Sequence, residues 1–199
     1  MTFQKITRDL NKIKFLFQKS NLFVNITDRM WEKEYKKKKF YWGLKPSPLL
    51  KEIIKYVPKG RALDIGAGEG RNSLFLAKNG FKVTAIDLIS EGLKKLKKAA
   101  KKRGLKIYTK TINVKKFKFV PSKYSLIILI SAIDFLKKSE IEKIIPKIKK
   151  SLIPGGAIYF SVFSVKDPQF KKIKKLNLKE VEKKHFLFAQ RKFLQTFFY

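Results

Sequence analysis

Cysteine is absent from this 199-residue chain, and histidine occurs only once, as His185. Without cysteine the chain has no disulfide framework, no thiolate nucleophile and none of the ligands that iron–sulfur clusters and cysteine zinc sites require. A single histidine also excludes a metal site built from several histidines. We therefore predict a protein without a bound metal, in which His185 has a packing or surface role rather than a catalytic one.

Long hydrophobic runs are missing as well. The longest apolar stretch, Leu126–Ile133, is far shorter than the roughly 20 residues that a membrane-spanning helix needs. The first residues of the chain are too polar for a secretory signal peptide. These features predict a cytoplasmic protein without a membrane span.

Acidic residues are scarce, with 15 of them against 48 basic residues and a formal net charge of +33 at pH 7. Such a charge attracts nucleic acid, anionic lipid and acidic partners at low salt. However, 42 of the basic residues are lysine and only six are arginine, the residue that is favoured for bidentate recognition of phosphates and bases. We interpret the charge mainly as a solvated lysine coat that gives weak, nonspecific nucleic-acid binding, with a dedicated nucleic-acid surface as the alternative.

Hydrophobic residues make up 44% of the chain and aromatic residues 14%, which is enough for a buried core. The length predicts one compact domain with short additions. We divide the chain into a basic, aromatic helical segment or lid over residues 1–45, a central domain over 46–165, and a tail over 166–199. The tail is rich in lysine and phenylalanine, and is either natively short or truncated.

Strands and helices are expected to alternate through the central domain. The sequence predicts five strands, at Arg61–Ile65, Phe81–Ile86, Leu105–Ile112, Tyr124–Ser131 and Ala157–Val162. It predicts helices over Phe3–Phe17, Asp28–Lys39, Ser47–Tyr56, Arg71–Lys78, Ser90–Gly104 and Ser139–Leu152. This order is typical of an α/β fold with a Rossmann-like, doubly wound and mostly parallel sheet in a three-layer α/β/α arrangement.

A glycine-rich loop follows the first predicted strand. Gly66, Gly68 and Gly70 allow unusual backbone angles and the close approach of a ligand beside a helix N-terminus. A dinucleotide fingerprint would need a further glycine where the chain has Arg71, which weakens the assignment of a nicotinamide cofactor. Asp87 ends the second strand 21 residues after Gly66, where a carboxylate can accept both hydroxyls of a ribose. The pattern predicts a nucleoside-bearing ligand.

The chain resembles the class I S-adenosylmethionine-dependent methyltransferases in three segments, Leu63–Asn72, Ala77–Asp87 and Pro154–Gly156. Within that superfamily it resembles the tellurite-resistance (TehB-type) branch at Tyr41–Gly43, Gly70–Asn72 and Leu76–Asp87. The likeness extends over roughly residues 41–163. It implies that the central domain binds S-adenosyl-L-methionine as its cofactor and transfers the methyl group.

The resemblance also implies a set of cofactor-binding residues: Asp64, Gly66, Ala67, Gly68, Gly70, Arg71, Asp87, Leu88, Asn113, Val114 and Ser131. In the family's arrangement Asp64 and the glycine loop contact the methionine part, Asp87 the ribose, Leu88 the adenine ring and Asn113 the adenine amino group, while Ser131 lies beside the methyl-transfer site. The alternatives are that Asp64 caps the following helix, Arg71 only begins it, Asn113 is a turn residue and Ser131 faces the core. Asp134 is interpreted as a solvated loop carboxylate, with a substrate contact as the alternative.

Four aromatic residues, Trp31, Tyr35, Tyr41 and Trp42, precede the first strand, where related enzymes fold a lid over the cofactor. An aromatic cage there would attract a sulfonium through cation–π interactions, worth about 0.5 to 2 kcal/mol. Plain packing of the four rings is the alternative.

The methyl sulfonium is an activated donor, so methyl transfer requires alignment of the nucleophile and exclusion of water rather than a catalytic triad. We name no general base. The branch suggests a small nucleophile, such as a chalcogen oxyanion, a thiol or an amine. One alternative is an RNA or protein methyltransferase guided by the basic surface, although an Asn-Pro-Pro-Tyr-type motif is missing after the fourth strand, where the chain has Ser131–Asp134. Another is a non-catalytic binding protein with this fold.

The C-terminal end departs from the family pattern. Relatives usually add a sixth and a seventh strand, whereas this chain stops at Tyr199, within what resembles a last helix over Arg191–Tyr199. We therefore expect a five-stranded sheet that lacks the two terminal strands and has an unpaired edge. Together with the many large apolar residues of the tail, this edge predicts self-association of the chain.

Overall fold

The computed structural model describes residues 21–133, 136, 138–161 and 195–198. Its helices are α2 (Asn21–Lys36), α3 (Leu50–Ile53), α4 (Arg71–Lys78), α5 (Ser90–Lys101) and α6 (Lys138–Lys150), with a 3₁₀ turn η2 (Val114–Lys116). Its strands are β1 (Arg61–Ile65), β2 (Lys82–Asp87), β3 (Ile107–Thr111), β4 (Tyr124–Ile130), β5 (Leu152–Ser161) and β6 (Gln195–Phe198).

The strands form one sheet in the order β3-β2-β1-β4-β5-β6. The first five are parallel, and β1 pairs with β2 on one side and with β4 on the other. The apolar strand β4 lies in the middle of the sheet and is buried along almost its whole length, as its sequence predicts. The doubly wound sheet is confirmed, and the strand order reverses between β1 and β4, which is where open α/β sheets bind their ligands.

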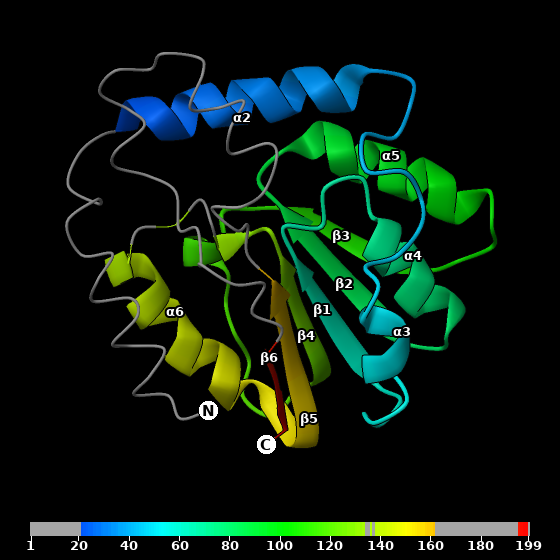
Figure 1. Cartoon of the computed structure of the whole chain (residues 1–199), viewed down its shortest axis with the longest axis vertical. Coiled ribbons are helices and arrows are strands. Elements are labelled where there is room, and N and C mark those ends of the chain that lie inside the picture. The colour runs from blue at the N-terminus through cyan, green and yellow to red at the C-terminus, as the bar shows by residue number, and fades with distance from the viewer. Residues whose placement is uncertain (1–20, 134–135, 137, 162–194, 199) are drawn as a thin grey trace.

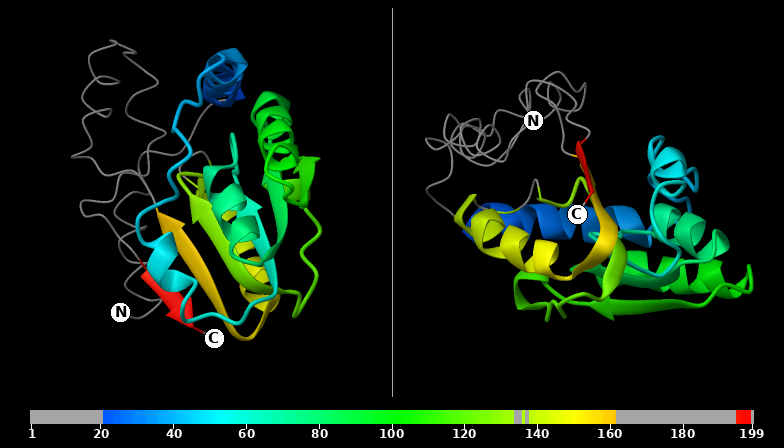
Figure 2. Two further views of the ribbon diagram at one scale, coloured as in Figure 1. Left: turned by 90° about the vertical axis from the view of Figure 1, so that its right-hand side faces the viewer. Right: turned by 90° about the horizontal axis from the view of Figure 1, so that it is seen from below.

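Helices cover both faces of the sheet, so the three-layer arrangement is confirmed (Figures 1 and 2). On one face, Leu76 of α4 belongs to the same buried cluster as Ala62 of β1. On the other face, Ile148 of α6 packs with Leu63, the next residue along β1. Alternate residues of a strand point to opposite faces, so β1 contributes to both halves of the core. Helix α2 lies across the carboxyl ends of the strands (Figure 1).

Several helices and strands begin or end at other residues than predicted. Helix α3 is a single turn instead of the ten residues expected from its amphipathic pattern. Strand β5 begins at Leu152, so that Pro154-Gly155-Gly156 lies inside the strand rather than before it. Gly155 has a φ of +73°, and the pairing of β5 with β4 shifts register beside Tyr124. An irregularity of this kind accommodates the three residues without ending the strand.

The five parallel strands are confirmed, but the expectation that the sheet ends with them and leaves the edge of β5 unpaired is wrong. Residues 195–198, expected to be helical, form strand β6, which pairs antiparallel with β5 (Figure 2). Threonine and aromatic residues favour strands, and β6 gives the backbone groups at the edge of β5 their hydrogen-bond partners. The assumption that nothing pairs with this edge, on which the expected self-association partly rested, is therefore corrected.

Some predicted features lie outside the described residues, namely the helix over Phe3–Phe17, Asp134, His185 and most of the tail over 166–199. Among the helices that the structure describes, none combines the length and the apolar character that a membrane crossing requires.

Candidate functional site

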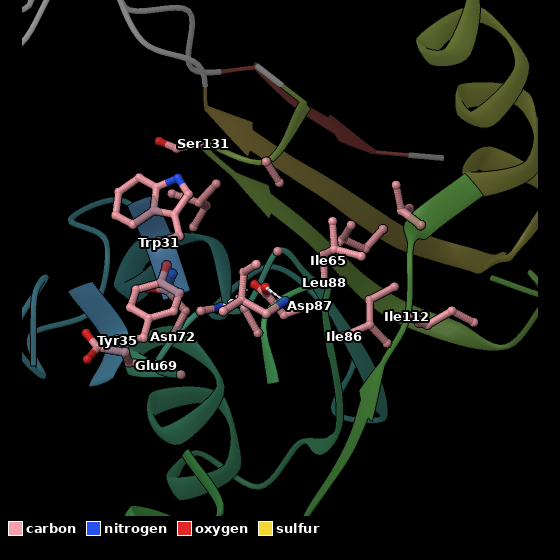
Figure 3. Close-up of a pocket in the computed structure, with 18 of the residues that line it drawn as sticks. Trp31, Tyr35, Ile65, Glu69, Asn72, Ile86, Asp87, Leu88, Ile112 and Ser131 are labelled. Carbon is pink, nitrogen blue, oxygen red and sulfur yellow. Dashed lines mark hydrogen bonds between the residues drawn. The ribbon is translucent and has the colours of Figure 1, made fainter. Parts of the chain in front are cut away.

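A cavity of about 400 Å³ opens at the carboxyl ends of β1, β2 and β4, beneath α2 (Figure 3). It is bounded by the glycine loop after β1, by Asp87 and Leu88 after β2, by the segment before η2, and by the end of β4. Ten of the eleven residues predicted to bind the cofactor line it, namely Gly66, Ala67, Gly68, Gly70, Arg71, Asp87, Leu88, Asn113, Val114 and Ser131. The structure therefore brings these ten residues together at one cavity, and their role in cofactor binding stays a prediction.

The glycine loop leaves no room for side chains. At Gly66, φ is +72° and an added Cβ would lie 2.6 Å from the Cβ of Ala132. At Gly68, φ is +53° and an added Cβ would lie 2.8 Å from the hydroxyl oxygen of Tyr35. Both positions therefore need glycine for the backbone angle and for space. The loop is also fixed to β2, because the N–H groups of Gly66 and Ala67 donate to the carbonyl of Ile86.

Asp87 is held in place by two backbone donors. Its Oδ2 accepts a hydrogen bond from the N–H of Gly68 at 2.7 Å, and its Oδ1 accepts one from the N–H of Ile89 at 2.8 Å. Burial raises the pKa of the carboxyl group, while these backbone hydrogen bonds act in the opposite direction. Each carboxylate oxygen has a second lone pair, so the group can still accept two hydrogen bonds from a diol.

Asp64 is the predicted cofactor residue that does not line the cavity. Its side chain is 2% exposed and accepts a hydrogen bond of 2.6 Å from the hydroxyl of Ser73, in the first turn of α4. Burial raises its pKa to about 7, partly offset by the hydrogen bond from Ser73. The geometry corresponds to the alternative in which Asp64 fixes the start of the following helix.

Asn113 is a turn residue that also lies at the cavity. Its Oδ1 accepts a hydrogen bond of 3.0 Å from the N–H of Lys115 and so caps η2, and the residue also lines the cavity. Ser131, at the end of β4, has a left-handed φ of +53°, which is uncommon for a residue other than glycine. Its N–H donates to the carbonyl of Ser161, which fixes this turn against β5.

The four aromatic residues come together as one cluster. Trp31 stacks on Tyr35 with ring centroids 5.5 Å apart, and Tyr41 meets Trp42 edge to face at 4.9 Å. The Trp31 ring also lies 5.3 Å from that of Tyr41. Trp31, Tyr35 and Trp42 line the cavity, whereas Tyr41 does not. From here on we use the word lid only for residues 28–43, the part of the predicted segment 1–45 that carries this cluster.

Two aromatic residues of the lid, Tyr35 and Trp42, lie beside charged side chains of the cavity wall. Burial raises the pKa of the Tyr35 phenol, and the nearby carboxylates of Asp87 and Glu69 raise it further. The Arg71 guanidinium lies 5.6 Å from the centre of the Trp42 ring. Arg71 thus contacts the lid as well as beginning α4, which the sequence alone did not indicate.

Sequence reasoning missed four charged groups that line the cavity. Asp28 of the lid is partly buried, and this burial raises the pKa of its carboxyl group. Lys115 and Glu140 form an ion pair of 2.7 Å between η2 and α6. Glu69, inside the glycine loop, is almost fully buried and accepts hydrogen bonds from other elements. Of these residues, only Glu69 could have been found from the sequence. A carboxylate between two glycines of a loop that is expected to be buried needs a hydrogen-bond or charge partner.

Comparison with known proteins gives a consistent family. The family model described as tellurite resistance protein TehB matches residues 29–187. A probable S-adenosyl-L-methionine-dependent methyltransferase TehB of Haemophilus influenzae (strain ATCC 51907 / DSM 11121 / KW20 / Rd) is 28% identical over 105 residues. The aligned part is 53% of this chain and 36% of that protein, so the match spans about a third of the relative's length.

Solved structures share the fold. A SAM-dependent methyltransferase from Methanosarcina mazei is 25% identical with a TM-score of 0.58, and the match covers 77% of this chain and 79% of that one. TehB from Haemophilus influenzae is 23% identical with a TM-score of 0.55, over 67% of this chain and 44% of the other. A phosphoethanolamine N-methyltransferase of Haemonchus contortus, in complex with phosphoethanolamine and S-adenosylhomocysteine, is 17% identical with a TM-score of 0.60, over 75% of this chain and 34% of the other.

Proposed function

The chain belongs to the family of tellurite resistance protein TehB, and on this basis we propose that it binds S-adenosyl-L-methionine and transfers a methyl group to a small nucleophile. The observation that carries the proposal is the hydrogen bond from Gly68 to Asp87, which joins the glycine loop and a diol-binding carboxylate at the rim of one cavity. Fold and family alone would allow many ligands.

The cavity has features that fit this cofactor. The loop needs glycine at positions 66 and 68, because a Cβ there would meet Ala132 or Tyr35, and the bare backbone of both residues borders the cavity. In our proposal Asp87 accepts the ribose hydroxyls, Leu88 and Val114 contact the adenine ring, and the amide of Asn113 pairs with the adenine amino group. The glycine loop and Arg71 hold the methionine part, with Arg71 as a donor to its carboxylate.

When bound, the cofactor supplies an activated methyl group, so the chain itself has to align the acceptor and exclude water. Trp31, Tyr35 and Trp42 cover the cavity from the lid side and give apolar surface that keeps water out. Ser131 lies at the end of the central strand β4, on the side where we expect the acceptor. No general base is part of the proposal.

A small acceptor is favoured by the size of the cavity. About 400 Å³ is at the lower end of the usual range for ligand sites, and the cofactor itself takes up much of this volume. A chalcogen oxyanion, a thiol or an amine would fit the remaining space, whereas a folded RNA or protein would have to contact the outer surface.

A nucleic-acid acceptor is the second candidate, supported by the lysine-rich outer face of α5. Lys94, Lys97, Lys98 and Lys101 are exposed there, as is Lys102 just beyond the helix. Such a surface neutralises phosphates without sequence preference, so binding to it falls steeply as salt rises.

Cytoplasmic location, self-association through the tail and the domain limits at residues 45 and 165 stay predictions.

The test is calorimetry with S-adenosyl-L-methionine and S-adenosylhomocysteine, followed by transfer of a labelled methyl group to selenite, tellurite, a small thiol, a small amine and RNA. We expect both nucleosides to bind and one small acceptor to become labelled. Binding without labelling of any acceptor would favour the non-catalytic alternative. Failure of both nucleosides to bind the folded protein would contradict the proposal.

A further inference from the structure

Glu69 lies within the glycine loop, yet its carboxylate bonds to two other parts of the molecule. Its side chain is only 2% exposed. One oxygen accepts a hydrogen bond of 2.6 Å from the backbone N–H of Tyr41 in the lid. The other oxygen forms an ion pair with the ammonium group of Lys95 on α5. The loop, the lid and α5 are thus joined at one carboxylate, which Figure 3 shows beside Tyr35.

Lys95 strengthens the same connection from its own side. Besides pairing with Glu69, its ammonium group donates to the backbone carbonyl of Lys39 at 3.0 Å. It also lies 5.3 Å from the centre of the Phe40 ring, within the range of a cation–π interaction. Three consecutive residues of the lid, 39 to 41, are therefore held by this one charge pair.

The burial of Glu69, with Lys95 partly buried beside it, makes the pair depend on the position of the lid. A buried carboxylate is stable only when its partners satisfy it, and a buried ion pair that loses one partner becomes strongly unfavourable. If the lid moved away, Glu69 would lose the N–H of Tyr41, and Lys95 would lose both Lys39 and the Phe40 ring. The lid position with all of these contacts is consequently favoured over intermediate positions.

We propose that Glu69 and Lys95 form a latch that keeps the lid closed over the cavity and sets how long a bound nucleoside stays there. The inference rests on the proposed cofactor site, because Glu69 lies between Gly68 and Gly70 of the loop that would hold the ligand. Both are positioning residues. They act on the ligand through the loop and through the aromatic cluster of Trp31, Tyr35, Tyr41 and Trp42.

The chain carries its own reporter for this motion. It has two tryptophans, Trp31 and Trp42, and both belong to the lid cluster. Their fluorescence and its quenching by acrylamide therefore report on the lid and not on a distant region. Stopped-flow fluorescence with S-adenosylhomocysteine as the probe gives the dissociation rate constant of the nucleoside, and denaturation with urea gives the global stability.

Lys95→Met is the main variant, because methionine keeps the unbranched shape and most of the length of the side chain while removing the charge. Lys94→Met is its matched control, since Lys94 is the neighbouring residue and pairs with Glu91 on the surface. Glu69→Gln tests the other half of the pair, and Lys95→Arg tests rescue by a residue that keeps the charge.

We expect Lys95→Met and Glu69→Gln to release S-adenosylhomocysteine about 5- to 10-fold faster than the unmodified protein, because truncating one partner of a buried charge pair acts mainly on dissociation. Their tryptophans should be more accessible to acrylamide in the absence of ligand. Lys94→Met should match the unmodified protein, and Lys95→Arg should recover most of the slow dissociation.

Three results would overturn the latch. The first is an unchanged dissociation rate in folded Lys95→Met and Glu69→Gln. The second is an equal effect of Lys94→Met, which would indicate general loss of charge. The third is failure of Lys95→Met to fold, which would mean that the ion pair is needed for folding and not for holding the lid. If the unmodified protein does not bind S-adenosylhomocysteine but Lys95→Met still increases quenching, the cofactor proposal fails while the contact between latch and lid stands.

Discussion

The backbone N–H of Gly68 and the carboxylate of Asp87 are joined by a hydrogen bond of 2.7 Å. Gly68 belongs to the loop after β1, and Asp87 is the last residue of β2, so this bond ties together two adjacent βα connections of the sheet. A second bond, from the N–H of Ile89, fixes the other oxygen of the same carboxylate. The acceptor group and the loop that would surround a ligand are therefore already arranged relative to each other before any ligand binds.

Replacement of Asp87 by asparagine should weaken the binding of S-adenosylhomocysteine by about tenfold or more. The amide has one acceptor oxygen instead of two, so either a backbone N–H or a ribose hydroxyl loses its partner, at a cost of about 1 to 3 kcal/mol. Calorimetry gives the affinity, and circular dichroism checks the fold. Glu52→Gln, at an exposed carboxylate on α3, is the control and should bind normally. Unchanged affinity in a folded Asp87→Asn would remove Asp87 from the site.

Replacement of Gly68 by alanine should displace the lid as well as the ligand. The new Cβ would meet the Tyr35 hydroxyl at 2.8 Å, in addition to the strain of a residue with φ of +53°. We expect loss of S-adenosylhomocysteine binding and a change in tryptophan fluorescence.

Gly104→Ala separates these two effects. Gly104 has a similar φ of +64°, but nothing lies within 4 Å of the added Cβ. This control should lose some stability and keep both binding and fluorescence. If Gly104→Ala impaired binding as much as Gly68→Ala does, backbone strain alone would explain the result and the contact with Tyr35 would be irrelevant.

Asp64 should make the protein less stable as the pH rises from about 4 to about 7. Burial raises its pKa from 3.8 to about 7, so in this window the folded state keeps a proton that the unfolded state has lost. The free energy of unfolding then falls with pH, by at most about 1.4 kcal/mol per unit. This loss in the free energy of unfolding is absent below pH 4 and complete above pH 7.

Asp64→Asn replaces the ionisable carboxyl group by an amide, whose oxygen can still accept the hydrogen bond from Ser73. The free energy of unfolding of this variant, relative to the unmodified protein, should therefore rise between pH 4.5 and pH 7.5 in urea titrations. A constant difference across the pH range would mean that Asp64 ionises in the folded protein as it does in the unfolded chain.

The parts of the site that sequence alone could predict are those set by short-range patterns. The glycine loop, Asp87 and the segment Asn113–Val114 each follow a predicted strand, and parallel strands bring their carboxyl ends to one edge of the sheet. The buried strand β4 was equally clear, because its continuous apolar run has few other interpretations.

The parts that sequence could not predict depend on tertiary contacts. Glu69 and Lys95 are 26 positions apart and lie in a chain with 48 basic residues, so no pattern selects this pair from the others. The position of Asp64 beneath the cavity follows from the placement of α4, not from the loop motif. The helix expected over Arg191–Tyr199 follows from the resemblance to the family, whereas pairing with β5 decides the conformation of residues 195–198.

Removal of residues 195–199 should lower stability and favour association of the chain. Strand β6 pairs with β5 from Ala157 to Phe160, and without it these backbone groups form an exposed edge. An open edge is a template for pairing with another chain, so we expect larger species in sedimentation velocity and a lower midpoint of thermal unfolding. The full 199-residue chain at the same concentration is the reference, and salt is kept constant because the net charge of +33 opposes association. If the shortened chain sediments and unfolds as the full chain does, the pairing of β6 with β5 contributes nothing to protecting the sheet, and the edge of β5 must be covered by other residues.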